Sequence, residues 1–151
     1  MTNQEITKII KDKFKKDILK VETEPDLTIY VSNDKILQIC QFLHDNEELN
    51  FVYLSDICGV DYPERSPRFD VVYHLYSIEK NHRIRIKTAV GDGETISSVT
   101  GIWQGANWFE REVYDLLGVE FDNHPDLRRI LMPDDWQGHP LRKDYPLEAI
   151  K

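Results

Sequence analysis

Residues 69–90 read FDVVYHLYSI, EKNH and RIRIKTAV, and their pattern indicates the centre of the fold. Its first part, Phe69 to Ile78, is rich in β-branched and aromatic residues and predicts a long strand. In its last part, Arg83 to Val90, Ile84 and Ile86 alternate with basic residues, which is the pattern of a half-buried antiparallel strand. Asn81 and its neighbours are expected to form the turn between them. The stretch therefore predicts a sheet with one buried face.

Shorter patterns on both sides of this stretch predict helices and further strands. Apolar residues at helical spacing predict helices near residues 3–19, from Ser32 or Asn33 to about 47, and near residues 107–117. The buried stripe of the second helix is expected to be Ile36, Ile39, Cys40 and Leu43. Thr2 and Glu5 have the spacing of a capping box for the first helix, and Gly118 is expected to end the third. Short strands are expected at residues 27–31 and 51–54, with a further short element at residues 96–103.

The segment from Asp122 to Lys151 has a different composition. Four prolines exclude a long helix, yet the segment keeps apolar residues that a disordered tail would lack: Leu127, Ile130, Leu131, Met132, Trp136, Leu141, Tyr145 and Leu147. We interpret it as an extended arm that packs on its own domain or on a partner. The prediction is thus an α+β fold: one core domain over residues 1–121, with a mainly antiparallel sheet flanked by helices on one face, and a Pro-rich arm over residues 122–151.

Composition excludes several classes of protein. The chain has 151 residues and a net charge of −8, so nucleic-acid binding, which needs clustered cations, is not expected. No run approaches the roughly 20 apolar residues that span a bilayer, and the N-terminus lacks the apolar stretch of a secretory signal, so we expect a cytoplasmic protein. Cys40 and Cys58 form no CxxC motif, which argues against zinc-ribbon and cysteine-ligated iron–sulfur sites. We expect both to be buried, reduced thiols.

The predicted third helix carries the charged residues of greatest interest. On a helical wheel, Glu112 falls at the edge of the apolar face and Glu110 at its other edge. Arg111 and Asp115 fall on the opposite side, where they are expected to form a surface pair. A carboxylate beside an apolar face needs a cationic partner or hydrogen bonds, and four cations follow in the arm: Arg128, Arg129, Arg142 and Lys143. On this interpretation Glu112→Ala destabilises the folded domain or its assembly, by roughly 1–3 kcal/mol if a buried cation loses its partner.

Two interpretations of these carboxylates compete. In the first, Glu110 or Glu112 is a general acid or base with His124 as its partner. In the second, the carboxylates fix the arm to the helix. We favour the second, because the sequence offers no nucleophile, phosphate-binding loop or metal-ligand spacing near them, and His124 and His139 lack the spacing of a metal site.

The basic face of the last strand also has two interpretations. Arg83, Arg85 and Lys87 could meet an acidic partner, or they could form a solvated face paired with acidic neighbours such as Glu79. The pattern alone favours neither.

Several long motifs resemble those of the family of the C-type subunit (the 30 kDa-type subunit) of respiratory complex I, NADH:quinone oxidoreductase. The resemblance covers roughly residues 51–147. Its blocks are DICGVDY at 56–62, RFDVVYHL at 68–75, ERE and DLL within 110–117, HPDLRRIL at 124–131 and WQGHPLRKDYPL at 136–147. The signature positions carried over are Glu110, Arg111, Glu112, Asp115, His124, Asp126, Arg128 and Arg129.

The resemblance implies a structural component without catalytic residues or a cofactor of its own. NADH, flavin, iron–sulfur clusters and quinone would bind elsewhere in a proton-translocating complex. This chain would lie in the peripheral arm of the complex, on the cytoplasmic side of the membrane. It would dock against the D-type subunit and other neighbours, close to the quinone-reducing module. The signature residues, with Arg142 and Lys143, would hold the arm and the interface.

Two rival functions remain open at this point. One is the equivalent role in a related complex that takes electrons from ferredoxin, reduced deazaflavin or hydrogen. The other is a free-standing hydrolase or metalloenzyme that uses Glu112 and His124. A stoichiometric metal lost in His124→Ala would favour the latter.

Overall fold

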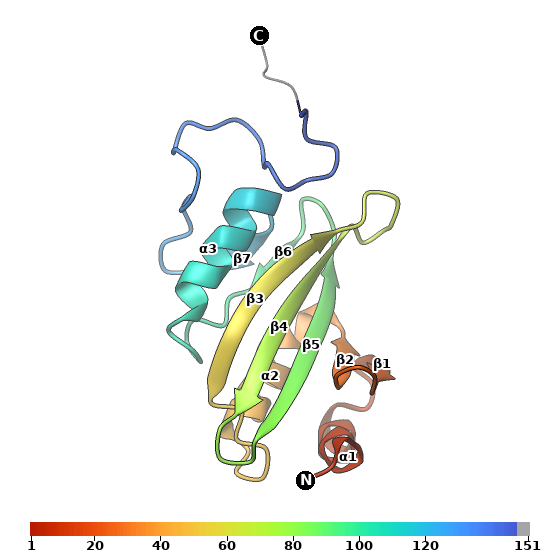
Figure 1. Ribbon diagram of the computed structural model, residues 1–151. Helices are drawn as coiled ribbons and strands as arrows, with labels where there is room; N and C mark the ends of the chain where they lie inside the picture. The colour runs from red at the N-terminus through yellow and green to blue at the C-terminus, as the bar shows by residue number, and fades with distance from the viewer. Residues whose placement is uncertain (148–151) are drawn as a thin grey trace.

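The computed structural model describes residues 1–147, which form one mixed sheet of five strands with helices on one side (Figure 1). The strand order is β1-β2-β5-β4-β3. In chain order the strands are β1 (Ile18–Glu22), β2 (Thr28–Val31), β3 (Tyr53–Asp61), β4 (Phe69–Ser77) and β5 (His82–Val90). A parallel pair, β6 (Thr95–Ser97) and β7 (Glu120–Asp122), forms a small second sheet.

The predicted strand pair is confirmed as the centre of the sheet. β4 and β5 pair antiparallel, with Tyr73 opposite Ile86 and Leu75 opposite Ile84. These four side chains are buried on one face of the sheet, as the alternation predicts. β3 adds to β4 antiparallel, and β2 joins β5 in the sheet's one parallel pairing. The sheet is therefore mainly antiparallel.

Three helices cover the buried face: α1 (Asn3–Phe14), α2 (Ile36–Asp45) and α3 (Ala106–Leu117). The predicted apolar stripe of α2 is fully buried in the core: Ile36, Ile39, Cys40 and Leu43. α3 packs closely on β3 because Gly59 has no side chain, and a Cβ there would clash with Leu117 and lie 3.2 Å from Val113. The core thus lies between the sheet and this helical layer.

Some predicted boundaries differ from the structure. Thr2 and Glu5 do form the capping box of α1, but α1 ends at Phe14 and Ile18 begins β1 instead of extending the helix. Ile18 pairs with Val31 of β2, so sheet pairing prevails over the helical spacing of the isoleucines. The second helix begins with a 3-10 turn, η1 (Asn33–Lys35), and has no side-chain cap.

Residues 123–147 contain no helix or strand and pass over the end of α3 (Figure 1, blue). This is the extended form that Pro125, Pro133, Pro140 and Pro146 favour. The preceding residue, Asp122, still belongs to β7.

Candidate functional site

The junction between α3 and the arm gathers most of the signature residues. Asp115 lies at its centre, with a fully buried side chain. One carboxylate oxygen accepts hydrogen bonds from the backbone N–H groups of Ile130, Leu131 and Met132, at 3.1, 2.7 and 2.9 Å. The other accepts one from the Arg129 guanidinium at 2.7 Å. A single carboxylate therefore fixes four consecutive residues of the arm.

The pKa of Asp115 reflects these contacts. Burial acts to raise this pKa, but the N–H groups of the arm and the Arg129 guanidinium outweigh it and hold the pKa below its usual value. Asp115 is therefore a carboxylate at neutral pH, and its charge is balanced by Arg129.

Two arginines complete the junction by donating to backbone carbonyls. Arg129 also donates to the carbonyls of Trp136 and Gly138, at 2.9 and 2.8 Å, which folds the arm back on itself. Arg111 donates to the carbonyls of Arg128 and Arg129, at 3.1 and 3.0 Å. The arm thus obtains from side chains the hydrogen bonds that regular secondary structure would otherwise supply.

The prediction that Arg111 and Asp115 form an exposed pair is wrong. Both side chains are buried, and each binds the arm instead of the other. The expected cationic partner of Glu112 in the arm is also not found, because Glu112 is exposed and no described residue hydrogen bonds to its carboxylate. The reason is that α3 is covered on two sides, by β3 and by the arm, and a helical wheel shows only the first of these.

Glu110, which the helical wheel places at the edge of the apolar face, is fully buried. It accepts a hydrogen bond from the Ser98 hydroxyl at 2.6 Å and one from the Val99 N–H at 2.7 Å. Burial raises its pKa to about 7, against the lowering effect of these two donors. Glu110 therefore ties α3 to the segment that leads into it from β6.

His124 lies beside Glu110, with its Nε2 3.9 Å from the carboxyl oxygen and its side chain fully buried. The Asn107 carbonyl lies 3.1 Å from Nε2, and the Asp126 N–H donates to Nδ1 at 3.0 Å. A carbonyl can only accept and an N–H can only donate, so these partners select the neutral ring protonated at Nε2. His124 thus anchors the beginning of the arm. Asp126 and Arg128 form an exposed ion pair, at 2.9 Å, beside it.

The far end of the arm closes the C-terminus of α3. Arg142 donates to the Leu117 carbonyl at 2.7 Å, the Leu141 N–H donates to the Leu116 carbonyl at 2.9 Å, and His139 Nδ1 lies 2.9 Å from the Asp115 carbonyl. Because the last carbonyls of a helix have no partner within it, the arm supplies the missing donors.

Gly118 lets the chain leave α3 beneath these donors, with φ at +81°. In Gly118→Ala the Cβ would lie 2.6 Å from Arg142 Nη2 and 2.7 Å from the His139 ring. We expect it to lower the free energy of unfolding by more than about 1 kcal/mol and to displace the arm, which urea unfolding and limited proteolysis would measure. Gly93→Ala is the matched control, since φ is +83° there and the added Cβ meets nothing within 4 Å. An equal effect of the two changes would contradict the predicted clash.

A second group of residues at the arm contains Asp61, Arg68, Asp92 and Asp144, which no pattern in the sequence predicted, together with the expected Arg142 and Lys143. Asp61, buried at the end of β3, accepts from the Arg68 guanidinium at 2.7 and 2.9 Å and from the Lys143 N–H at 2.8 Å. The Arg68 guanidinium holds the pKa of Asp61 below its usual value. Arg68 also reaches Asp144 of the arm at 3.0 Å, and Arg142 reaches Asp92 at 3.0 Å. Lys143 contributes its backbone, while its side chain is exposed. The spacing of these residues along the chain does not indicate that they pair. They do lie in three of the family motifs, at residues 56–62, 68–75 and 136–147, which meet at this point of the fold.

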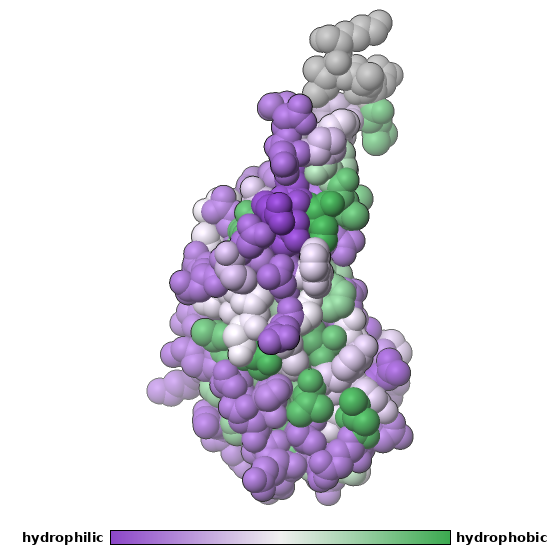
Figure 2. All heavy atoms as spheres, turned by 90° about the vertical axis from the view of Figure 1, so that its left-hand side faces the viewer, coloured by the Kyte–Doolittle hydropathy of each residue, from purple (hydrophilic) through white to green (hydrophobic). Residues whose placement is uncertain are grey.

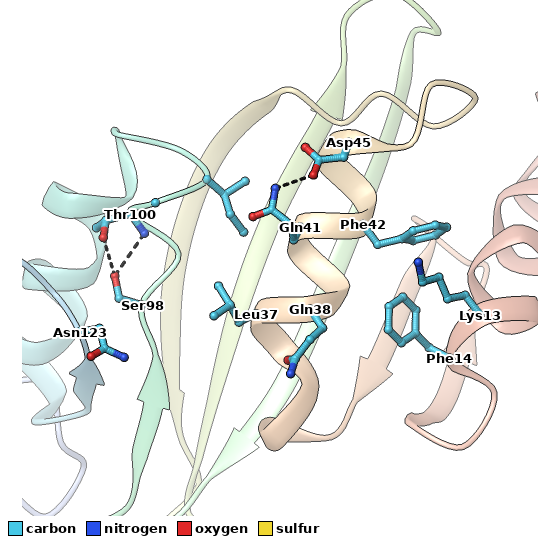
Figure 3. A pocket seen from close by; sticks show the side chains of 12 residues that line it. Lys13, Phe14, Leu37, Gln38, Gln41, Phe42, Asp45, Ser98, Thr100 and Asn123 are labelled. Atoms are coloured by element: carbon cyan, nitrogen blue, oxygen red, sulfur yellow. Dashed lines mark hydrogen bonds between the residues drawn. The ribbon is translucent and has the colours of Figure 1, made fainter.

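A groove of about 870 Å³ opens between α2, the end of α1 and residues 98–102 (Figure 3). Its apolar lining comes from Phe14, Leu37, Phe42 and Ile102. Figure 3 shows Lys13 beside Phe14 and Phe42, and its ammonium lies 4.8 Å from the centre of the Phe42 ring. The groove reaches Ser98, whose hydroxyl binds Glu110.

The junction is built to hold structure together. Asp115, Arg129 and Arg111 are all occupied by the arm, and Glu110 by Ser98 and Val99. No three His, Cys, Asp or Glu side chains in residues 1–147 are grouped so that they could hold a metal ion. Within the same residues, none of the helices has the length and apolar character needed to cross a membrane.

Comparison with known proteins agrees with the motifs. Residues 29–151 match the family described as respiratory-chain NADH dehydrogenase, 30 Kd subunit. The chain is 52% identical to the C-type subunit of NADH-quinone oxidoreductase from Geotalea uraniireducens, over 93% of this chain and 85% of that one. It is 50% identical to the same component from a Roseiflexus species, over 85% of this chain and 74% of that one.

A solved structure shares the fold. A chain in the membrane-bound sulfane sulfur reductase, an archaeal respiratory membrane complex, superposes with a TM-score of 0.81 and 29% identity, covering 95% of this chain and 85% of that one. The matched residues, 29–151, include β3, β4 and β5 of the sheet, α3 and the arm. The chain therefore belongs to the family of the 30 kDa, C-type subunit of respiratory-chain NADH dehydrogenase.

Proposed function

We propose that this chain is a structural component of the peripheral arm of a proton-translocating NADH:quinone oxidoreductase, on the cytoplasmic side of the membrane. In this proposal it binds no cofactor itself and docks against the D-type subunit through the arm and α3. The observation that carries the proposal is the junction itself, in which buried charged side chains hold an irregular segment in a fixed path. A segment held in this way is suited to presenting a rigid surface to a partner.

The surface of the arm supports docking. Large apolar side chains are exposed along it and on the neighbouring face of α3: Trp108, Leu131, Trp136, Leu141 and Leu147. Figure 2, which views the molecule from the α3 side, shows hydrophobic side chains at the surface close to the arm. Exposed apolar groups gathered in one region mark interaction surfaces in soluble proteins.

The positions of the two cysteines support the proposal that this chain binds no iron–sulfur cluster. Cys40 lies in the core on α2, where burial raises the pKa of its thiol, and Cys58 lies on β3. Neither forms part of a cysteine set that could ligate an iron–sulfur cluster.

A second candidate has support from the structural comparison. The archaeal complex that contains the similar chain is named as a sulfane sulfur reductase, not as an NADH dehydrogenase. A chain of this fold thus also serves in a respiratory membrane complex with a different named activity. The equivalent role in a complex with another electron donor is therefore our second proposal.

A tagged chain purified from the host's membranes in mild detergent tests both proposals. We expect a large assembly that contains the D-type subunit and oxidises NADH with a quinone. The same assembly without NADH activity would favour the alternative-donor complex. A chain that elutes alone would overturn both.

A substitution on the arm tests the docking surface. Leu131→Asp places a charge on a side chain that is 61% exposed, so the chain should fold while the D-type subunit is lost from the eluate. Ile78→Asp is the matched control, since Ile78 is also 61% exposed but lies beyond the end of β4, away from the arm. Equal retention of the D-type subunit by both variants would contradict docking at the arm.

A further inference from the structure

The sheet has a second face, opposite the helices. In Figure 1, α2 lies behind β3, β4 and β5, and no helix of residues 1–147 lies over the face toward the viewer. Strand alternation places on this side the residues between the buried ones of β2, β4 and β5. We define the open face by five of these side chains that are not buried: Tyr30, Tyr76, Arg83, Arg85 and Lys87.

The charge of the open face is opposite to that of the whole chain. The net charge of the chain is −8, yet β5 presents Arg83, Arg85 and Lys87 in one row. Residues four apart on a strand are separated by about 13 Å, so the row is long enough to run beside several residues of an extended peptide. Its one ion pair within residues 1–147 is between Arg85 and Asp26, at 3.5 Å, where Asp26 is itself exposed.

Aromatic rings hold the two ends of this row in place. The Arg83 guanidinium lies 5.2 Å from the Tyr76 ring, and the Lys87 ammonium lies 5.4 Å from the Tyr30 ring. Cations fixed over rings lose less side-chain freedom when an anion binds them. Tyrosine and arginine are also the residues in which the centres of protein interfaces are enriched.

A hollow of about 310 Å³ lies at the Arg83 end of the row, lined by Arg83, Arg85, His74 and Ser55 together with Asp26 and Asp56. Burial lowers the pKa of His74, and the positive charge of Arg85 lowers it further. The hollow therefore offers two guanidinium groups, a hydroxyl and a neutral imidazole. A guanidinium group binds a carboxylate with two parallel hydrogen bonds. The two aspartates that also line the hollow disfavour a free small anion, so further contacts must support the carboxylate that enters.

We propose that the open face is a second docking surface, which binds an acidic polypeptide segment of another protein of the complex, with carboxylates meeting Arg83 and Lys87 and apolar groups between them. This rests on the proposed role as a component of a complex. It is separate from the arm, because α3 and the arm contact the opposite face and edge of the sheet. It also chooses between the two interpretations of the basic strand, in favour of an acidic partner over a solvated face.

Charge reversal tests the proposal in the assembled complex. Arg83→Glu with Lys87→Glu should reduce the recovery of at least one other protein of the complex by about tenfold at physiological salt. Lys8→Glu with Lys11→Glu is the matched control, because it makes the same charge change at exposed positions on α1. Arg83→Gln with Lys87→Gln removes charge without adding it, and should give a smaller loss in a chain whose fold is less perturbed.

A chemical readout identifies the partner. Carbodiimide coupling, which joins an amine to a carboxylate in contact with it, should link Lys87 to an Asp or Glu of another protein of the complex. Unchanged recovery in both Arg83 and Lys87 double variants, without such a cross-link, would overturn the open face as a docking site while the assembly itself still stood.

The same variants distinguish two other possible binding partners of the open face, a lipid surface and a second copy of this chain. If the wild-type chain binds anionic vesicles and the charge-reversed chain does not, the proposal is overturned in favour of a lipid surface. A Lys87 link to a second copy of this chain would overturn it in favour of self-association. A wild-type chain that elutes alone would remove the proposed function and this proposal together.

Discussion

Replacing Asp115 by alanine is expected to lower the free energy of unfolding by about 3–5 kcal/mol, because the partner of a buried arginine is removed. The change leaves Arg129 and three backbone N–H groups of the arm without their acceptor. Each unpaired buried donor carries its own desolvation cost. Urea unfolding would measure the loss, and limited proteolysis would show cleavage of residues 128–138 at a higher rate.

The same helix provides the control for Asp115. Glu112→Ala removes a carboxylate one turn away that is exposed, so we expect a change of at most about 0.5 kcal/mol. Asp115→Asn keeps one acceptor oxygen without the charge and should fall between the two. Comparable losses for Asp115→Ala and Glu112→Ala would mean that the junction does not hold the arm.

Replacing Glu110 by glutamine is expected to remove a fall in stability that the wild-type protein shows as pH rises. The carboxyl group has an ordinary pKa of 4.5, and burial raises its pKa to about 7 in the folded chain. Between these values the folded state keeps a proton that the unfolded state has released. The free energy of unfolding therefore falls as pH rises from 4.5 to 7, by about 3 kcal/mol in all.

Glutamine resembles the protonated carboxyl group at every pH. Its amide can accept from the Val99 N–H and donate to the Ser98 hydroxyl, so Glu110→Gln should match the wild-type protein near pH 5 and exceed its stability near pH 8. The lowered pKa values of Asp61 and Asp115 act at lower pH, outside this window.

Urea unfolding of both proteins at intervals from about pH 5 to pH 8 gives the difference directly. Subtracting the two curves removes the contributions of the groups that behave alike in the two proteins. Parallel curves would show that Glu110 keeps an ordinary pKa in the folded chain.

The arm shows how an irregular segment can be held without secondary structure. Asp115, Arg129 and Arg111 supply its hydrogen bonds at one end of the segment, and Arg142 and Asp61 at the other. Such networks are costly when incomplete, which is why both large predicted effects involve a buried carboxyl group.

Local patterns in the sequence were enough to predict the elements whose periodicity is set by burial on one face. Alternation at Ile84 and Ile86 predicted β5, and the helical stripe of Ile36, Ile39, Cys40 and Leu43 predicted the buried side of α2. Its long motifs also carried the family resemblance, which the comparisons confirm. Local periodicity is enough in these cases because one layer covers one face.

Which charged residues are buried depends on how the elements pack in three dimensions. A helical wheel gives the angle of each side chain, but not how many surfaces cover the helix, so it placed Asp115 outside and Glu112 at the core edge. The arm reverses this by covering the side of α3 opposite the sheet. Asp61 contacts Arg68, which is 7 positions away in the chain, and Lys143, which is 82 positions away. Electrostatic pairing of this kind depends on distance in space, which the order of residues along the chain does not record.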